Sequence, residues 1–332
     1  MKRKLAFLLM LCFGWSFFLN GCGGTLPKTD DRLQVVCTIF PEYDWARQLT
    51  QGVDNVDLTL LVKNGTDLHS YQPSVRDIAM IARADVFCYV GGVSDTWVND
   101  VLDTTENRTA QLVSMAEAAD ADEEVLAEGM QAEHEHEHEH DHHDDESDSH
   151  EEPPELDEHV WLSLRRAALA CTAMKKALCK ADPAHEDIYN QNCTDYLQKL
   201  QELDSDFTEM TSQAARDTIV VADRFPFRYL AEDYGLTYYA AFPGCSAETE
   251  ASFETIVFLS EKVESLHLPC VLVTEGSNSS LAKTILENAG SDGKILTLQS
   301  LQAVSQKEID TGVTYLSKMQ ENYDVLKQAL NS

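Results

Sequence analysis

Apolar residues recur along the chain in two series of short strand-like and longer helix-like segments. In the first series, β-branched or apolar runs at residues 33–40, 56–62 and 85–90 predict buried strands, and apolar spacing over residues 74–84 predicts a helix. The second series predicts strands at 218–222, 237–241, 270–274 and 294–298, and helices at 227–234, 252–265, 278–289 and 312–330. Alternation of strand and helix is typical of parallel sheets, so the sequence predicts two α/β lobes.

A long helical pattern separates the two series. Asp182 and Pro183 open it, and apolar residues then continue at helical spacing for about thirty residues, or roughly 45 Å of helix. We expect one rigid linking helix over residues 182–216, between an amino-terminal lobe at 33–181 and a carboxyl-terminal lobe at 217–332. Ligand sites of such folds lie at the carboxyl ends of strands, so the cleft between the lobes is the expected site.

Residues 1–21 have the pattern of a secretion signal. A basic start precedes an apolar run over residues 5–19, which is too short to span a bilayer comfortably. The sequence Leu-Asn-Gly-Cys that ends at Cys22 resembles the lipobox of bacterial lipoproteins. We therefore expect cleavage before Cys22, acylation of its thiol, and a tether over residues 22–32 that holds the protein on the outer face of the cell membrane.

The composition is strongly acidic. The chain of 332 residues has 25 Lys and Arg against 57 Asp and Glu, a net charge of −32, and loss of the three basic residues in the signal would make it −35. Nucleic acid and anionic membrane surfaces are therefore disfavoured as partners. The length without the signal is suited to two domains with a connector.

The cysteines do not predict a disulfide framework. Beyond Cys12 and Cys22 there are seven, an odd number, and no two have the Cys-x-x-Cys spacing. Several fall in apolar runs, where a small buried thiol is expected. Cys245 differs because it lies in a Pro-Gly-Cys-Ser loop. A structural role is favoured for it over a reactive or metal-facing one.

A segment rich in acids and histidines interrupts the amino-terminal half. Residues 120–158 contain nineteen acids and no Lys or Arg, so we expect a loop without packed structure over about 120–156. Imidazoles interleaved with carboxylates favour weak binding of transition metals in several arrangements, although a solvated charge run is the simpler alternative. The loop histidines are His134, His136, His138, His140, His142, His143 and His150.

Three features, taken in order, resemble the zinc- and manganese-binding solute receptors of ABC importers. They are Gly-x-Asp-x-His-x-Tyr-x-Pro at residues 65–73, the loop at 133–150, and Asp-x-His-x-Trp-Leu at 157–162. The resemblance covers essentially the whole chain after the signal. It implies that His69 and His159 are metal ligands, that the metal is Zn²⁺ with Mn²⁺ as the alternative, and that a monomeric receptor, not an enzyme, delivers it to the permease of an ABC importer.

The second lobe departs from the family pattern. Arg224 stands where zinc-binding members have a third histidine, and Gln299 stands where a late aspartate is usual, whereas Glu275 matches a family acid. An arginine cannot ligate a cation. Either Asp223 supplies an oxygen ligand with support from Glu275, while Arg224 pairs with an acid such as Glu250, or the site is a weaker two-histidine centre completed by water or the loop. The first alternative is favoured.

Two other kinds of function fit parts of this pattern. A zinc hydrolase would need a metal-bound water, but the sequence has no His-Glu-x-x-His motif and no nucleophile elbow. A surface adhesin or metal buffer would bind metal through the loop alone. Deletion of residues 133–150 distinguishes a receptor from a metal buffer. A receptor should keep one tight metal site, whereas a buffer should lose nearly all metal binding.

Overall fold

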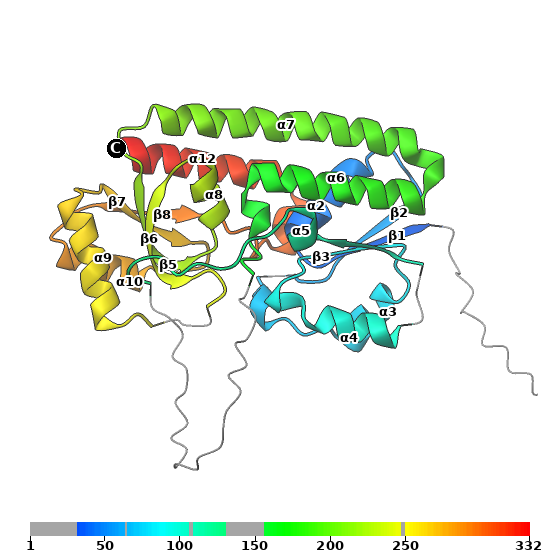
Figure 1. The fold of residues 1–332 in the computed structure, drawn as a ribbon, viewed down its shortest axis with the longest axis horizontal. Helices are drawn as coiled ribbons and strands as arrows, with labels where there is room; N and C mark the ends of the chain where they lie inside the picture. Colours follow the sequence, from blue (N-terminus) through cyan, green and yellow to red (C-terminus); the bar gives the residue numbers. More distant parts are fainter. Residues whose placement is uncertain (1–31, 64, 106–108, 131–155, 247–249) are drawn as a thin grey trace, which may run out of the picture. The chain divides into compact units, whose positions relative to one another are not determined.

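Two parallel four-stranded sheets form the framework of the structure, a computed structural model (Figure 1). The structure describes residues 32–63, 65–105, 109–130, 156–246 and 250–332. The first sheet has the order β2-β1-β3-β4 and contains β1 Leu33–Cys37, β2 Val56–Leu60, β3 Val86–Tyr89 and β4 Gln111–Ser114. The second has the order β6-β5-β7-β8 and contains β5 Thr218–Phe225, β6 Thr237–Pro243, β7 Cys270–Thr274 and β8 Lys294–Leu298. The predicted fold of two parallel α/β lobes is confirmed.

The central strands are apolar because helices cover both faces of each sheet. Val35 in β1, Phe87 in β3 and Leu272 in β7 have no exposed surface. A parallel strand buried on both faces lacks the alternation of a half-exposed strand, which explains the continuous apolar runs in the sequence. The polar residues that follow these strands therefore gather at the carboxyl edges of the sheets.

A layer of long helices lies across both sheets (Figure 1). It consists of α6 Leu164–Ala181, α7 Glu186–Ser212 and α12 Tyr315–Asn331. The predicted linking helix corresponds to α7, which has 27 residues and follows a short 3₁₀ turn at Pro183–His185. Its buried side chains recur every three or four residues, as expected for a helix packed along one stripe. They are Tyr189, Cys193, Tyr196, Leu200, Leu203, Phe207 and Met210.

Shorter helices connect the strands and complete each lobe. In the first lobe they are α2 Phe40–Leu49, α3 Val75–Ile81, α4 Trp97–Thr104 and α5 Met115–Ala118. In the second they are α8 Arg228–Asp233, α9 Phe253–Ser265, α10 Ser280–Asn288 and α11 Gln306–Asp310. The sequence did not predict α4 or β4. Strand β4 has four residues, of which only Val113 is buried, so its apolar pattern is too short to detect.

Part of the acidic segment packs against the second lobe. The N–H of Asp122 donates a hydrogen bond to the Tyr229 hydroxyl at 2.9 Å, and Arg228 donates one to the carbonyl of Glu123. A Cβ added at Gly129 would lie 2.1 Å from the Phe258 ring. Residues 120–130 are therefore held in place, although we expected them to lack packed structure. The seven loop histidines and Cys22 lie outside the described residues.

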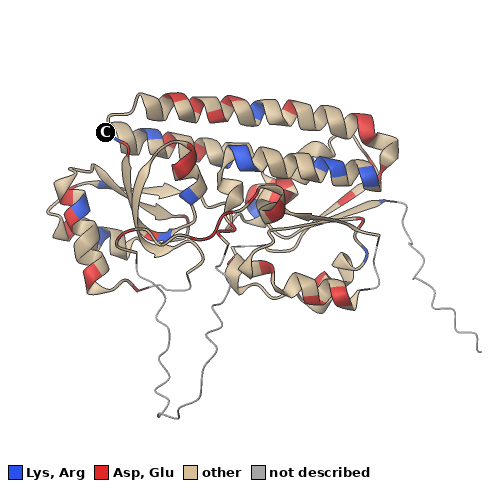
Figure 2. Cartoon of the chain, viewed as in Figure 1, with Lys and Arg blue, Asp and Glu red and all other residues tan. Residues whose placement is uncertain are grey.

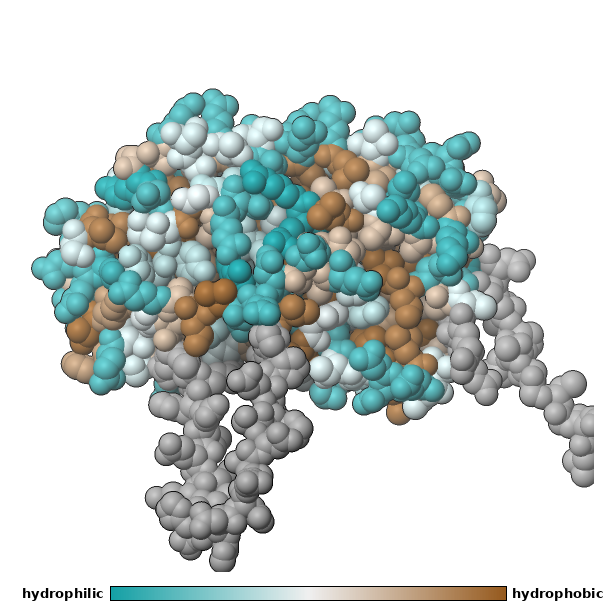
Figure 3. Space-filling model, viewed as in Figure 1, coloured by the Kyte–Doolittle hydropathy of each residue, from teal (hydrophilic) through white to brown (hydrophobic). Residues whose placement is uncertain are grey.

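The described surface is polar and acidic. Figure 2 shows acidic residues along α7 and on the segment that crosses between the sheets. On the face drawn in Figure 3, apolar side chains form separate groups among hydrophilic ones. Among the helices of the described residues, none is long and apolar enough to cross a membrane.

Candidate metal centre

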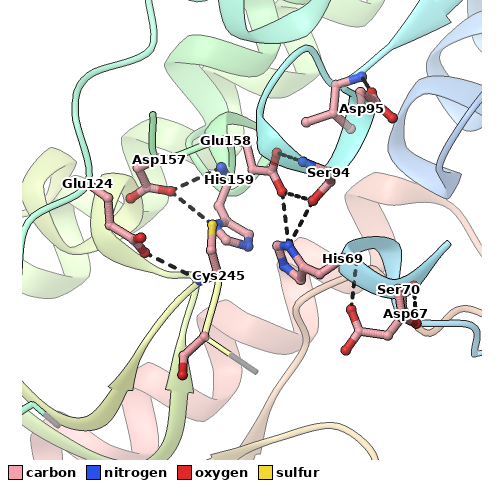
Figure 4. Close-up of polar contacts among 12 residues, drawn as sticks. Asp67, His69, Ser70, Ser94, Asp95, Glu124, Asp157, Glu158, His159 and Cys245 are labelled. Carbon is pink, nitrogen blue, oxygen red and sulfur yellow. Dashed lines mark hydrogen bonds and ion pairs between the residues drawn. The ribbon is translucent and has the colours of Figure 1, made fainter. Parts of the chain in front are cut away.

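His69 lies on a short 3₁₀ turn, Leu68–Ser70, in the loop that follows β2. The Asp67 carboxylate caps this turn and accepts a hydrogen bond from the backbone N–H of His69 at 3.0 Å. The side chain of His69 is 15% exposed, and its Nδ1 lies 2.7 Å from Ser94 Oγ and 3.1 Å from Glu158 Oε1 (Figure 4). The turn, the serine and the buried carboxylate together fix the orientation of this imidazole.

His159 comes from a segment ninety residues further along the chain. Asp157 Oδ1 accepts hydrogen bonds from the backbone N–H of His159 at 3.1 Å and from its Nδ1 at 2.9 Å. The ring has no exposed surface and lies between His69 and Trp161, with centroids 5.5 and 5.1 Å away. The indole of Trp161 donates a hydrogen bond to the carbonyl of Ser300 at 2.8 Å, which ties this segment to the second lobe.

These hydrogen bonds determine the tautomer of both histidines. The single hydroxyl proton of Ser94 is donated to Glu158, so His69 Nδ1 must carry the proton that it shares with Ser94 and Glu158. His159 Nδ1 likewise donates to the Asp157 carboxylate. Each Nε2 is then left with a lone pair, and both Nε2 atoms are buried without a hydrogen-bond partner. A carboxylate that orients the imidazole of a metal ligand through its other nitrogen is common in metal sites.

The surrounding acids change the pKa values of this cluster. Burial would raise the pKa of Glu158, but its hydrogen bond with His69 and the charges of both histidines outweigh burial and lower it. Burial would lower the pKa of His159, but the hydrogen bond and charge of Asp157, with the charge of Glu158, raise it above its ordinary value. The acids around His159 therefore favour a positive charge at its imidazole.

Cys245 brings the second lobe to the same point. It follows β6, and Figure 4 shows it beside His159. A Cβ added at the preceding residue, Gly244, would lie 2.8 Å from His159 Cε1. One ligand atom from each of His69, His159 and Cys245 lies within 4.8 Å of the other two. This is the one group of three potential metal-binding side chains of its kind among the described residues. The sequence favoured a structural role for Cys245. Its proximity to the two histidines depends on contacts between distant segments, which only the fold shows.

Asp223 and Arg224, at the end of β5, are engaged in other contacts. Asp223 accepts hydrogen bonds from the Arg224 N–H at 2.9 Å and from the Thr274 hydroxyl at 2.6 Å. The guanidinium of Arg224 pairs with Asp67 at 2.8 Å across the cleft, whereas we predicted a partner such as Glu250. Arg224, at the position where the resemblance leads us to expect a third histidine, thus contacts the loop that carries His69.

Glu275 and Gln299 likewise make contacts within the second lobe. Both carboxylate oxygens of Glu275 accept hydrogen bonds from Ser300, at 2.6 Å from its N–H and 2.7 Å from its hydroxyl. The backbone of Gln299 exchanges two hydrogen bonds with Asn322. Asp223 and Glu275 line the same cavity as His69, of about 580 Å³, but neither belongs to the group of three. As metal ligands they stay predictions from the sequence.

A family profile matches nearly all of the described chain. The profile, ZnuA, is described as the periplasmic component A of a zinc-uptake complex, and it matches residues 35–329. The chain belongs to this family. Its members are extracytoplasmic metal-binding receptors and not enzymes, in agreement with the expectation from the sequence.

Two relatives of similar sequence are named for zinc binding or zinc uptake. The zinc-binding lipoprotein AdcA of Streptococcus pneumoniae strain R6 is 31% identical over 328 residues, which are 99% of this chain and 61% of AdcA. The chain thus spans about three fifths of the length of this relative. The high-affinity zinc uptake system protein ZnuA of Bacillus subtilis is 30% identical over 329 residues, covering 98% of this chain and 96% of ZnuA.

Solved structures agree with the fold. The Zn(II)-bound ZnuA-like domain of Streptococcus pneumoniae AdcA aligns with a TM-score of 0.69 and 28% identity, over 91% of this chain and 100% of that domain. The metal-dependent lipoprotein YcdH of Bacillus subtilis aligns with a TM-score of 0.71 and 26% identity, over 90% of this chain and 100% of YcdH. The two-lobed arrangement is therefore shared with these proteins.

Proposed function

We propose that the protein captures a zinc ion between His69 and His159 and delivers it to the permease of an ABC importer. The observation that supports this is the pair of buried Nε2 atoms without partners, on two rings whose centroids lie 5.5 Å apart. A buried polar atom without a partner costs free energy, and a cation shared by the two nitrogens removes that cost. Delivery to an importer rests on the family of zinc-uptake components to which the chain belongs.

Zinc is the proposed metal, and manganese is the alternative. Neutral imidazole suits zinc, whereas manganese, magnesium and calcium favour oxygen ligands. The carboxylates nearest the two rings, Asp157 and Glu158, are engaged with the opposite ring nitrogens and leave each Nε2 for the ion. The relatives AdcA and ZnuA are named for zinc, which supports the same choice.

The protein is proposed to act as a monomer at the outer face of the cell membrane, held there by a lipid on Cys22. The lipobox-like sequence that ends at Cys22 and the description of AdcA as a lipoprotein support the anchor. Retention of radiolabelled palmitate by the wild type, and its loss in Cys22→Ser, is the expected result. Equal labelling of both proteins would exclude the anchor at this position.

The histidine-rich segment is proposed to gather metal ahead of the cleft. Seven imidazoles among acids are expected to raise the local concentration of divalent cations and to bind them weakly in several arrangements. The acids at residues 122–124, which precede this segment, contact the second lobe: Asp122 and Glu123 bond Tyr229 and Arg228 through their backbone, and Glu124 accepts a hydrogen bond from the Cys245 N–H. Metal released from the segment would therefore enter close to His159 and Cys245.

Isothermal titration with zinc tests the receptor function. The wild type is expected to bind one zinc ion tightly, and a protein lacking residues 133–150 is expected to keep that site. His69→Ala is expected to weaken tight binding by more than roughly 100-fold, above the usual effect of losing a group bonded to a ligand. His267→Asn is the matched control, because His267 lies outside the group and asparagine tolerates its φ of 50°. Unchanged zinc affinity in His69→Ala would overturn the proposal.

A further inference from the structure

We infer that the thiolate of Cys245 is the third protein ligand of the metal, in place of the histidine that Arg224 replaces. This inference rests on the proposed function and defines its donor set as two imidazole nitrogens and one sulfur. The ligand atoms of His69, His159 and Cys245 all lie within 4.8 Å of one another. In a tetrahedral zinc site, bond lengths of about 2.0–2.3 Å separate two ligand atoms by roughly 3.5 Å, so each separation would have to shorten by about 1.3 Å at most.

Gly244 allows the cysteine loop to approach the histidine. A Cβ added at residue 244 would lie 2.8 Å from His159 Cε1, 3.0 Å from its Nδ1 and 3.1 Å from the carbonyl oxygen of Phe225. A side chain here would therefore push the loop away from the imidazole. The backbone N–H of Cys245 also donates a hydrogen bond to Glu124 at 3.3 Å, which holds the loop from its other side.

Arg224 joins the two loops that carry ligands from opposite lobes. Its guanidinium pairs with Asp67 at 2.8 Å, two residues before His69, and lies 3.5 Å from the carbonyl oxygen of Ser246, the residue after Cys245. A histidine at this position could bind the metal but could not reach both loops as a cation with several donors. In this inference, Cys245 in the neighbouring loop takes over the role of metal ligand that position 224 loses when it holds an arginine.

A second, independent observation points to a ligand at this place. The imidazole of His159 has no exposed surface, and its Nε2 has no hydrogen-bond partner. Most other described cysteines occur in buried strands and helices, such as Cys37 in β1, Cys171 in α6 and Cys270 in β7. Cys245 is the one cysteine among the described residues that belongs to a group of three possible metal ligands, with its sulfur within 4.8 Å of a ring nitrogen of His69 and of His159.

A sulfur ligand changes the metals that the site prefers. Thiolate is a soft ligand that favours zinc, whereas manganese favours carboxylate, carbonyl and water. The inference therefore predicts strong discrimination against manganese. Cys245→Asp, which replaces the sulfur ligand with oxygen, is expected to lower the ratio of zinc affinity to manganese affinity.

Cobalt substitution tests the inference directly, because Co²⁺ bound to a thiolate shows a sulfur-to-metal charge-transfer band in the near ultraviolet. The metal-free protein is titrated with CoCl₂, and the wild type is expected to show the band at one equivalent. Cys179→Ser, at a partly buried cysteine of α6, is the matched control and is expected to keep it. Cys245→Ser is expected to lose the band and to bind zinc at least roughly 10- to 100-fold more weakly.

A second variant separates loss of the ligand from loss of the fold. Cys245→His supplies a nitrogen and is expected to bind zinc more tightly than Cys245→Ser while the charge-transfer band stays absent. A band that persists in Cys245→Ser would overturn the inference, and so would zinc affinity equal to wild type in that variant. If either result is found while zinc binding still depends on His69, the proposed receptor function is retained and only the role of Cys245 is rejected. If the wild type does not bind zinc tightly, both the proposed function and the inference are wrong.

Discussion

Both lobes place polar side chains near the candidate metal centre but use them differently. In the first lobe, Ser94, Asp157 and Glu158 bond the Nδ1 atoms of the histidines and leave each Nε2 without a partner. In the second lobe, Asp223 and Glu275 have their oxygens engaged by neighbours in the same lobe. The first lobe therefore leaves two buried nitrogens without a partner, whereas the carboxylates of the second lobe are already oriented by hydrogen bonds.

Among the side chains that support the two histidines without binding the metal, the largest effect on zinc affinity is expected from Glu158→Gln. Glu158 is buried and holds both His69 and Ser94, and its charge favours a cation at the imidazoles. Glutamine keeps the shape but not the charge, so zinc affinity is expected to fall roughly tenfold, at the lower end of the effect of such partners. Zinc titration against a competing chelator measures the change.

The control for this variant is Glu117→Gln, an exposed glutamate of α5 in the same lobe. Its zinc affinity is expected to equal that of the wild type. A similar loss in both variants would mean that the net charge of the lobe, and not the contact with His69, determines the affinity.

A smaller effect is expected when the contact between the lobes is removed. The Arg224–Asp67 ion pair is about one third exposed at both side chains, and such pairs contribute about 1 kcal/mol or less. Arg224→Gln is therefore expected to lower zinc affinity by about fivefold or less, because both ligand loops become less restrained. Faster zinc release in stopped-flow measurements would show the same change. A loss as large as that of His69→Ala would instead make Arg224 essential to the site.

The smallest effect on zinc is expected at Glu42, a buried carboxylate of the same lobe that is outside the group of three. Burial, with the nearby charge of Asp95, raises the pKa of Glu42 from 4.5 to about 8. The folded protein thus keeps this proton to higher pH than the unfolded chain. The contribution of Glu42 to stability is complete below about pH 4.5 and is lost as the pH rises to about 8.

Glu42→Gln removes this titration. Urea unfolding in the presence of a chelator is expected to show a free energy of unfolding that falls less between about pH 5 and pH 8 than in the wild type, where one such group contributes at most about 1.4 kcal/mol per pH unit. Its zinc affinity at pH 7 is expected to match the wild type. An identical pH dependence in both proteins would contradict the raised pKa.

The sequence predicted the framework well because repeated apolar runs are local signals. Strands such as β7 and β8 were expected at the residues where they occur, and the long helix was expected over a range that contains α7. Strand β4 was missed because its four residues hold a single buried side chain. The packing of residues 120–130 was missed because it depends on Tyr229 and Phe258, about a hundred residues away.

His69 and His159 could be predicted to lie together because each belongs to a short motif that resembles the family pattern, and the structure brings them into one group. The metal ligands of the second lobe could not be predicted in the same way. In the sequence, an acid at the end of a strand looks the same whether or not its oxygens accept hydrogen bonds in the fold. Only the tertiary structure placed Thr274 beside Asp223, Ser300 beside Glu275, and Cys245 beside two imidazoles. Local patterns determine which segments fold, whereas contacts between distant segments decide which lone pairs remain for a metal.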